Sequence, residues 1–453
     1  MSASAVASTD TQVTVKKDSV PEIIAASMVG TAIEFYDNYC YSIAAASYFG
    51  TIFFTSVAKS NPALATLMSF VTFAVSFLAR PFGSLLFGHF GDKMGRKKTL
   101  VIALLTMGIS TFVVGLLPGY EQIGAWAVVI LCVCRACQGV GLAGEWSGAA
   151  LVATENAPAN KRALYGSFPN LGAPIGFFCA YGINLLLTTS LTHDQMLSFG
   201  WRIPFLLSAV LVIVGLYVRE RMSETPIFKK AAEEKRTSKH PLRDLLPYWK
   251  EVVLGTVAMG ITYTLFYTLG TWSLSYGVTG LGFKEPEYLG MQMVSVVFFA
   301  AFIIVGCLWA DKSGRKKVLL ATTSATLVFS LVCPALLQHN VAMIMVFLCI
   351  GFLLMGGLFG PSGAYLPELF PTSVRYSGAY LPELFPTSVR YSGAGLSYNL
   401  AAIFGGAFAP TIATWLVGKY GIMSLGWYLG VMSALALVAL FLIKESKDKD
   451  YTK

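Results

Sequence analysis

The chain carries one short loop twice, first as Gly88-His89-Phe90-Gly91-Asp92-Lys93-Met94-Gly95-Arg96-Lys97-Lys98 and again as Ala310-Asp311-Lys312-Ser313-Gly314-Arg315-Lys316-Lys317. Each copy has an acid, a glycine three residues later and an Arg-Lys-Lys run, and each lies between long apolar stretches. The glycines let the backbone turn at low steric cost, and the cationic cluster resists entry into hydrocarbon. Two such loops at corresponding places predict a duplicated membrane bundle.

The composition excludes an ordinary soluble globule, because 55% of the residues are hydrophobic, 13% are charged and the mean hydropathy is +0.64. The apolar residues form blocks of about 20 or more, the length that crosses a bilayer core of ~30 Å as helix. We therefore expect an all-α membrane protein with twelve transmembrane helices in two six-helix bundles. The expected spans are 24–50, 63–87, 99–118, 123–150, 163–188, 201–219, 250–276, 287–310, 318–337, 341–363, 395–418 and 423–443.

A long polar stretch divides the first six spans from the last six. We expect an N-terminal bundle at residues 24–219, a central loop at 220–249 and a C-terminal bundle at 250–443. Residues 1–23 and 444–453 would then be tails, and the polar N-terminus resembles no cleaved signal peptide. Two related bundles are the architecture of alternating access around a site near the middle of the membrane.

The net charge of +9 reflects membrane topology. Lysine and arginine gather in alternate loops, most densely around residues 93–98, 219–250 and 312–317. Because loops rich in these residues stay in the cytoplasm, the pattern places both termini and the central loop there. The chain is therefore expected to lie in a lipid bilayer and to bind no nucleic acid.

Three ionisable side chains inside the spans suggest proton coupling. Glu34 and Asp37 lie three residues apart on one face of the first span, and Arg135 lies in the fourth. Charges in an apolar span are costly unless they are paired or face water. Protonation of an acid that neutralises Arg135 would free the arginine to meet an anion. We expect Asp37 and Arg135 to form the coupling pair, with Glu34 beside it. The alternatives are a static ion pair, and a Glu34 that only faces a vestibule.

The substrate candidates are polar or aromatic side chains within the spans. Arg135 is expected to meet a substrate carboxylate, and the other candidates are Gln138, Tyr36, Tyr41, Asn170, Tyr263, Tyr267, Tyr398 and Asn399. The alternative for the aromatic residues is packing or an interfacial belt. Arg80, before Pro81, could attract an anion or extend to the membrane interface.

Charges near the cytoplasmic helix ends predict two gating networks. The first would join Asp92, Arg96, Glu155 and Arg162; the second would join Asp311 and Arg315 with Glu368 or Glu383 and with Arg375 or Arg390. Several charges at one helix end could hold a conformation by a few kcal/mol. The alternative is that these charges only mark the cytoplasmic face.

One segment occurs twice without a change: residues 364–378 recur letter for letter as residues 379–393. We expect the additional residues to loop out on the cytoplasmic side, where polar and proline-containing insertions are tolerated. The sequence leaves open which copy performs the native role.

Several kinds of chemistry lack a sequence signal. The chain has no GxxxxGK[ST] string for nucleotide, and its histidines show no metal-ligand spacing. Cys134 and Cys137 have redox spacing but lack the strand-to-helix context of a redox motif, so we expect no metal and no cofactor. An intramembrane catalytic cluster is absent as well, which argues against an enzyme. A sensor would carry a signalling domain, and the polar segments are too short for one.

The Asp92 and Asp311 loops resemble the signature of the major facilitator superfamily, and Arg135-Ala136-Cys137-Gln138-Gly139 resembles its fourth-helix motif. Further strings are similar to the metabolite:proton symporter family, which includes shikimate, alpha-ketoglutarate and proline/betaine permeases. They are Glu34-Phe35-Tyr36-Asp37, Arg80-Pro81-Phe82-Gly83, Gly144-Glu145-Trp146, Gly166-Ser167-Phe168, Gly200-Trp201-Arg202-Ile203-Pro204 and Glu383-Leu384-Phe385-Pro386-Thr387-Ser388-Val389-Arg390.

The resemblance implies a twelve-helix secondary transporter in a bacterial inner membrane. Its partners would be protons and a small organic acid or zwitterion, and we expect a monomer. A facilitator or a proton antiporter that exports small molecules is the alternative on the same fold. The chain departs from the family pattern at the fifteen-residue repeat and at Ala143, where a glycine is usual.

Overall fold

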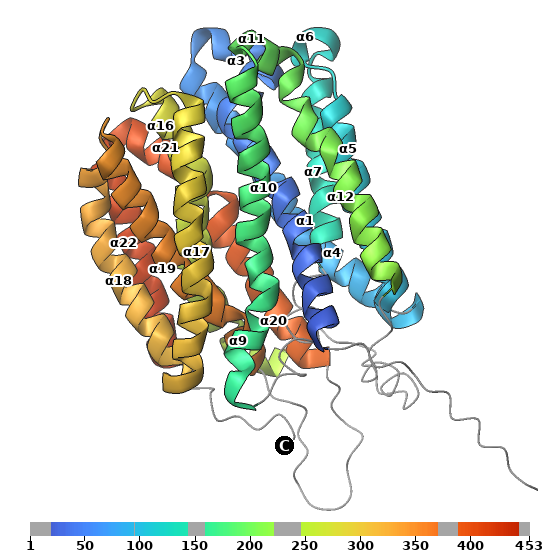
Figure 1. The fold of residues 1–453 in the computed structure, drawn as a ribbon, viewed down its shortest axis with the longest axis vertical. Helices are drawn as coiled ribbons and strands as arrows, with labels where there is room; N and C mark the ends of the chain where they lie inside the picture. The colour runs from blue at the N-terminus through green and yellow to red at the C-terminus, as the bar shows by residue number, and fades with distance from the viewer. Residues whose placement is uncertain (1–19, 95, 144–158, 222–245, 370–387, 444–453) are drawn as a thin grey trace, which may run out of the picture.

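The computed structural model describes residues 20–94, 96–143, 159–221, 246–369 and 388–443. The described part of the chain is helical and contains no strand. Long helices run side by side along the longest axis of the molecule, with the first half of the chain on one side and the second half on the other (Figure 1).

The first half contains six long helices: α1 (Val20–Ser47), α4 (Pro62–Met94), α5 (Arg96–Leu116), α7 (Trp126–Leu142), α10 (Phe168–Ser190) and α12 (Arg202–Arg221). Short elements connect them: α2 (Phe49–Phe53), α3 (Thr55–Ser60), α6 (Tyr120–Ile123), η1 (Ala159–Lys161), α9 (Arg162–Gly166), α11 (His193–Gln195) and the π-helical η2 (Met196–Gly200).

The second half has six long helical segments, two of which contain a π-helical stretch. The short η3 (Leu246–Tyr248) precedes them. They are α15 (Trp249–Tyr267) with η4 (Thr268–Trp272) and α16 (Ser273–Thr279); α17 (Glu285–Ser313); α18 (Arg315–Leu336); α19 (Val341–Leu369); α20 (Ser388–Ala401) with η5 (Ala402–Ala407) and α21 (Ala409–Tyr420); and α22 (Met423–Leu442).

These helices account for the twelve expected spans. By length and composition, eight described segments could each cross a membrane, and η2 and α12, bent by 44° where they meet, form a ninth with α11. Two shorter apolar helices lie in α5 and α7, and α1 carries the acids that the sequence places in the first span. Large apolar side chains such as Phe82, Leu331 and Phe441 are exposed on the outside, as expected where lipid replaces water.

The second copy of the repeated loop turns at its glycine. α17 ends at Ser313, Gly314 has φ +104°, and α18 begins at Arg315. A side chain would be strained at that backbone angle, so the sequence expectation for this glycine is confirmed. Lys316 donates hydrogen bonds to the carbonyl oxygens of Phe441, at 3.0 Å, and Ile443, and thereby ties the end of α22 to the loop.

Small residues let α4 and α7 approach closely. A Cβ added to Gly139 would overlap the carbonyl oxygen of Ser76, and one added to Gly83 would overlap the backbone of Val140. Close approach of this kind is a common source of helix association in membranes. It also brings Arg135, which lies one turn from Gly139, against α4.

The fifteen-residue repeat is divided between two helices. Residues 364–369 of the first copy form the end of α19, and residues 388–393 of the second copy begin α20. Residues 370–387, on which the prediction of a looped-out insertion falls, lie outside the described residues.

The two halves contact each other at both ends of the bundle. α10 packs along α17, α9 contacts α17 and α19, and α4 contacts η5. We call the end at α9 and the start of α20 the α9 end, and the opposite end, at α3, α6 and α11, the α11 end (Figure 1).

Candidate functional site

A chain of buried polar side chains connects three helices of the first half. The Arg135 Nη1 atom donates to Gln138 Oε1 at 2.8 Å, and Gln138 Nε2 donates to Thr111 Oγ1 at 2.7 Å. The Thr111 hydroxyl lies 2.9 Å from Asp37 Oδ2 and completes the chain from α7 through α5 to α1. All four side chains are at most 3% exposed. Because polar groups are costly inside an apolar bundle, they are expected either to have a function or to be paired with other polar groups.

Arg135 is held tightly within the first half. Its guanidinium carbon lies 3.9 Å from the centre of the Tyr41 ring and 5.3 Å from that of Phe73, and Nη2 donates to the Phe73 carbonyl at 3.3 Å. Stacking on aromatic faces suits a planar and weakly hydrated guanidinium. Tyr41 in turn shares a hydrogen bond of 2.7 Å with Thr72. The aromatic rings and the amide therefore fix the position of the charge.

The expected coupling pair is linked indirectly. Within the described residues no ion pair joins Asp37 to Arg135, and Gln138 and Thr111 lie between them. Sequence reasoning did not single out Thr111. The available signal was a hydroxyl in the third span, but Thr106 and Ser110 lie in the same span, and threonine often satisfies its hydroxyl on its own helix, so Thr111 did not stand out.

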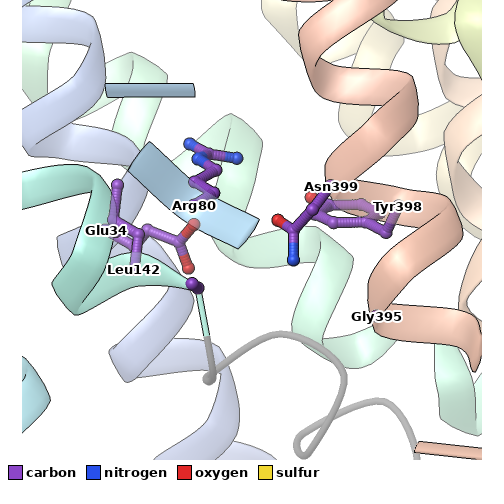
Figure 2. A pocket seen from close by; sticks show the side chains of 7 residues that line it. Glu34, Arg80, Leu142, Gly395, Tyr398 and Asn399 are labelled. Carbon is purple, nitrogen blue, oxygen red and sulfur yellow. The ribbon is translucent and has the colours of Figure 1, made fainter. Parts of the chain in front are cut away.

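A small pocket lies between the two halves, one helical turn from Asp37. Glu34, Arg80, Leu142 and Ala143 line it from the first half, and Gly395, Tyr398 and Asn399 line it from the second. Figure 2 shows the Glu34 and Arg80 side chains on one side and the Asn399 and Tyr398 side chains on the other.

Arg80 does not extend to the membrane interface. Only 5% of it is exposed, and its guanidinium lies 4.5 Å from the centre of the Phe77 ring and close enough to Glu34 for electrostatic interaction. The structure thus places Arg80 at the pocket between the halves and not at the membrane interface, and the attraction of an anion by Arg80 stays a prediction.

The remaining substrate candidates divide into two groups. Tyr398 and Asn399 line the pocket, and the rings of Tyr263 and Tyr267 continue from Tyr398, with centre separations of 5.3 and 6.4 Å. Three others make contacts away from the pocket lining: Tyr36 donates to the Pro204 carbonyl at 3.0 Å, Tyr41 contacts Thr72, and Asn170 donates to the Phe359 carbonyl at 2.8 Å.

Side chains join the two halves toward the α11 end. Asn38 donates to the Tyr267 hydroxyl at 2.9 Å, Ser42 and Thr271 share a hydrogen bond, and Tyr48 donates to Glu285 at 2.7 Å. Tyr181 donates to the Gly270 carbonyl in η4 at 2.8 Å. Tyr181 therefore ties α10 to the π-helical stretch η4 of the second half.

A carboxylate joins the halves at the α9 end. The backbone amides of Ala163 and Leu164, at the start of α9, donate to Asp311 at 2.9 and 3.0 Å. Arg315 lies 3.3 Å from both Asp311 and Glu368. A negative charge is favourable at a helix N-terminus, so Asp311 stabilises the contact between α9 and α17.

Part of the two predicted gating networks can be placed. In the second network, Arg315 contacts both Asp311 and Glu368. Glu368, from the first copy of the fifteen-residue repeat, is therefore an acid that joins this network. Arg375 and Glu383 lie outside the described residues, and Arg390 begins α20 with a side chain that is not described. In the first network, Glu155 lies outside the described residues and the side chains of Asp92 and Arg96 are not described, while Arg162 is the first residue of α9.

The comparisons with known proteins agree with this arrangement. The family model described as Major Facilitator Superfamily matches residues 27–381. This chain belongs to the major facilitator superfamily. It is a multi-pass membrane transporter of metabolites and not an enzyme.

Named relatives lie within the same superfamily. The chain is 49% identical over 435 residues to the inner membrane metabolite transport protein YhjE of Escherichia coli K12, with 94% of this chain and 95% of that protein covered. It is 32% identical over 447 residues to the E. coli K12 shikimate transporter, with coverage of 93% and 94%. It is 30% identical over 440 residues to the E. coli K12 proline/betaine transporter, with coverage of 94% and 84%.

Solved structures share the fold. A partially occluded, inward-open form of the E. coli xylose transporter XylE matches with a TM-score of 0.73 at 18% identity, covering 95% of this chain and 99% of that one. XylE bound to 6-bromo-6-deoxy-D-glucose, a proton:xylose symporter, matches with a TM-score of 0.72 at 18% identity and coverage of 95% and 97%.

Proposed function

We propose that this transporter moves a small organic acid or zwitterion together with protons by alternating access. The observation that carries the proposal is the hydrogen-bonded chain from Arg135 to Asp37. It places the Asp37 carboxyl and the Arg135 guanidinium in an apolar bundle, where Thr111 and Gln138 connect them without direct contact. A carboxylate in such a place is either balanced by a cation or protonated.

Asp37 has the geometry of a proton carrier. Thr111 holds its Oδ2 atom, and its Oδ1 atom has no hydrogen-bond partner among the described residues. A proton bound at Oδ1 would remove the negative charge that balances Arg135. An anionic group entering the nearby pocket would restore the balance. Proton and substrate would therefore each favour the binding of the other, which is the requirement for symport.

The pocket has the chemistry of a site for a carboxylate. A guanidinium can bind a carboxylate through two parallel hydrogen bonds, and Arg80 presents one to the pocket. Asn399 and Tyr398 offer an amide and a hydroxyl from the other half. Glu34 adds a negative charge that suits a cationic group on a zwitterion. Because Arg135 is stacked on Tyr41 outside the pocket lining, we assign the substrate contact to Arg80 and the charge balance to Arg135.

The contacts at the two ends would act as gates. Opening toward the α11 end would break the bonds of Asn38, Ser42 and Tyr48 to the second half, and opening toward the α9 end would break the bonds of Asp311 to α9. A transporter that alternates between two states needs closures of comparable strength, because a large bias would trap one state.

The charge pattern supports an orientation with the α9 end in the cytoplasm. The end of α4, the start of α5 and the junction of α17 with α18 carry basic residues and lie at that end, and such basic segments are retained on the cytoplasmic side. Both termini would then be cytoplasmic. A bacterial inner membrane fits the name of the YhjE relative, and we expect the transporter to work as a monomer.

The test is uptake into proteoliposomes with an imposed pH gradient, acid outside. The panel of radiolabelled solutes contains shikimate, alpha-ketoglutarate, proline, glycine betaine and lactate. We expect at least one solute to accumulate above its external concentration and to lose accumulation when a protonophore collapses the gradient. Uptake that only equilibrates would indicate a facilitator, and expulsion of preloaded solute by the inward gradient would indicate an antiporter. Either result would contradict symport.

A further inference from the structure

Thr111 occupies the central position of the buried polar chain. Its Oγ1 atom has three polar neighbours: Gln138 Nε2 at 2.7 Å, Asp37 Oδ2 at 2.9 Å and the carbonyl oxygen of Met107 at 3.0 Å. The residue is fully buried on α5. A hydroxyl has one proton to donate and two lone pairs to accept with, so it cannot donate to both oxygens at once.

The chemistry of the neighbours fixes the direction of every other bond. An arginine only donates, so the Gln138 atom facing Arg135 must be the carbonyl Oε1. The amide Nε2 atom then faces Thr111, which must accept from it. Only the proton of the Thr111 hydroxyl has two possible acceptors, which are Asp37 Oδ2 and the Met107 carbonyl oxygen.

The two choices correspond to two charge states of Asp37. When Asp37 is ionised, the Thr111 proton points to Oδ2, and every donor from Arg135 onward points toward the carboxylate. When Asp37 carries a proton on Oδ2, that proton can point to Thr111, whose own proton then turns to the Met107 carbonyl. When the proton is on Oδ1, the first arrangement persists and only the net charge changes. Each arrangement satisfies the hydroxyl, so no side chain has to move.

We propose that Thr111 is a positioning residue for proton coupling, which holds Asp37 against the Gln138–Arg135 pair in both charge states and favours its ionised form, because a hydrogen bond to a carboxylate is stronger than one to a neutral carboxyl. The inference rests on the proposed function, in which Asp37 carries the proton. Thr111 itself neither binds substrate nor takes up the proton.

The titratable and charged groups that surround Asp37 in the described structure come from three helices. Arg135 of α7 and Tyr36 and Cys40 of α1 interact with it electrostatically, and Cys179 of α10 faces Tyr36 and Cys40. Tyrosine and cysteine ordinarily titrate above neutral pH, and arginine does not titrate in the working range.

The test compares Thr111→Val, which removes the hydroxyl at nearly constant shape, with Thr111→Ser, which keeps it. The purified full-length protein is titrated with infrared spectroscopy of the protonated-carboxyl band, and the component lost in Asp37→Asn is assigned to Asp37. This measurement requires no solute. Loss of one hydrogen bond to a charged group should move the midpoint of that component by about one to two pH units toward alkaline values in Thr111→Val. In Thr111→Ser the midpoint should stay close to that of the wild type.

An unchanged midpoint in Thr111→Val would overturn the inference. An equal shift in Thr111→Ser would overturn it too, because that shift would indicate packing and not the hydroxyl. Absence of any component that depends on Asp37 would also overturn it. The proposed function fails separately, if the wild type shows the component and its Thr111 dependence yet accumulates no solute in a pH gradient.

Discussion

The two halves of this transporter bury different kinds of polar side chains. Among the described residues, the first half buries four acidic or basic side chains: Glu34, Asp37, Arg80 and Arg135. The buried polar side chains of the second half include neutral groups such as Thr264, Thr271, Gln292 and Asn399, and its described buried charges, Arg315 and Glu368, lie at the α9 end. Each half has six long helical segments, and this difference in buried charge is why we propose the proton chemistry for the first half.

The described π-helical stretches are also placed differently: η2 of the first half lies before α12, whereas η4 and η5 lie inside long helical segments of the second half. η4 and η5 interrupt two of its long helices, and carbonyl groups there accept bonds from side chains: Gly270 from Tyr181 and Gln292, and Gly405 from Thr264. π-helical turns are frequent at functional sites, and they allow local changes in helix direction. We therefore propose that the first half carries the charges of the transport cycle and that helices of the second half change direction at η4 and η5 when the substrate binds.

The largest effect that bears on this comparison should follow Arg135→Ala. The substitution leaves Asp37 in the bundle without its balancing cation, and removing one partner of a buried charge pair typically costs about 3–5 kcal/mol. We expect loss of transport and a lower thermal unfolding temperature, measured by differential scanning fluorimetry on purified protein. In the double variant Arg135→Ala, Asp37→Asn stability should be partly restored, because neither charge then remains. A double variant as unstable as Arg135→Ala would contradict a linked charge balance.

A smaller effect separates the two sides of the pocket. Arg80→Lys keeps the charge but loses two-point binding of a carboxylate, and we expect the KM for uptake to rise about 10- to 100-fold. Asn399→Ala removes one neutral hydrogen bond, and KM should rise about 3- to 10-fold. Both values come from initial rates of uptake of the solute that the panel identifies. Equal KM values for Arg80→Lys and the wild type would remove Arg80 from the substrate site.

The smallest effect concerns the contacts between the halves at the two ends of the bundle. Asp311→Asn weakens the bonds to the amides of Ala163 and Leu164 and reduces the charge at the start of α9. We expect about tenfold faster hydrogen exchange in the peptide covering α9, read by mass spectrometry, for a loss of ~1–2 kcal/mol. Tyr48→Phe is the matched control, since it breaks one contact at the α11 end and should leave α9 exchange unchanged. Faster exchange in α9 in both variants would mean that the two ends open together.

The sequence predicted the fold well, because apolar blocks and basic loops record the membrane directly. It also located Asp37 and Arg135, since charges in apolar spans stand out. It could not predict that Thr111 lies between them, because that depends on how α5 and α7 pack, nor that Arg80 faces the interior, because rotation about the helix axis decides it. Glu368 and Glu383 have identical neighbours in sequence, so only the structure could place Glu368 beside Arg315.

The most direct test of proton coupling through Asp37 compares two kinds of transport in Asp37→Asn. Accumulation of the identified solute in a pH gradient is measured beside counterflow exchange at equal pH on both sides, with Asp194→Asn, an exposed acid at the α11 end, as the control. We predict that Asp37→Asn loses accumulation by at least about tenfold and retains exchange, because the variant can still bind substrate and change conformation but cannot change charge. Asp194→Asn should behave as the wild type in both assays. Accumulation that survives in Asp37→Asn at the wild-type level would contradict the account.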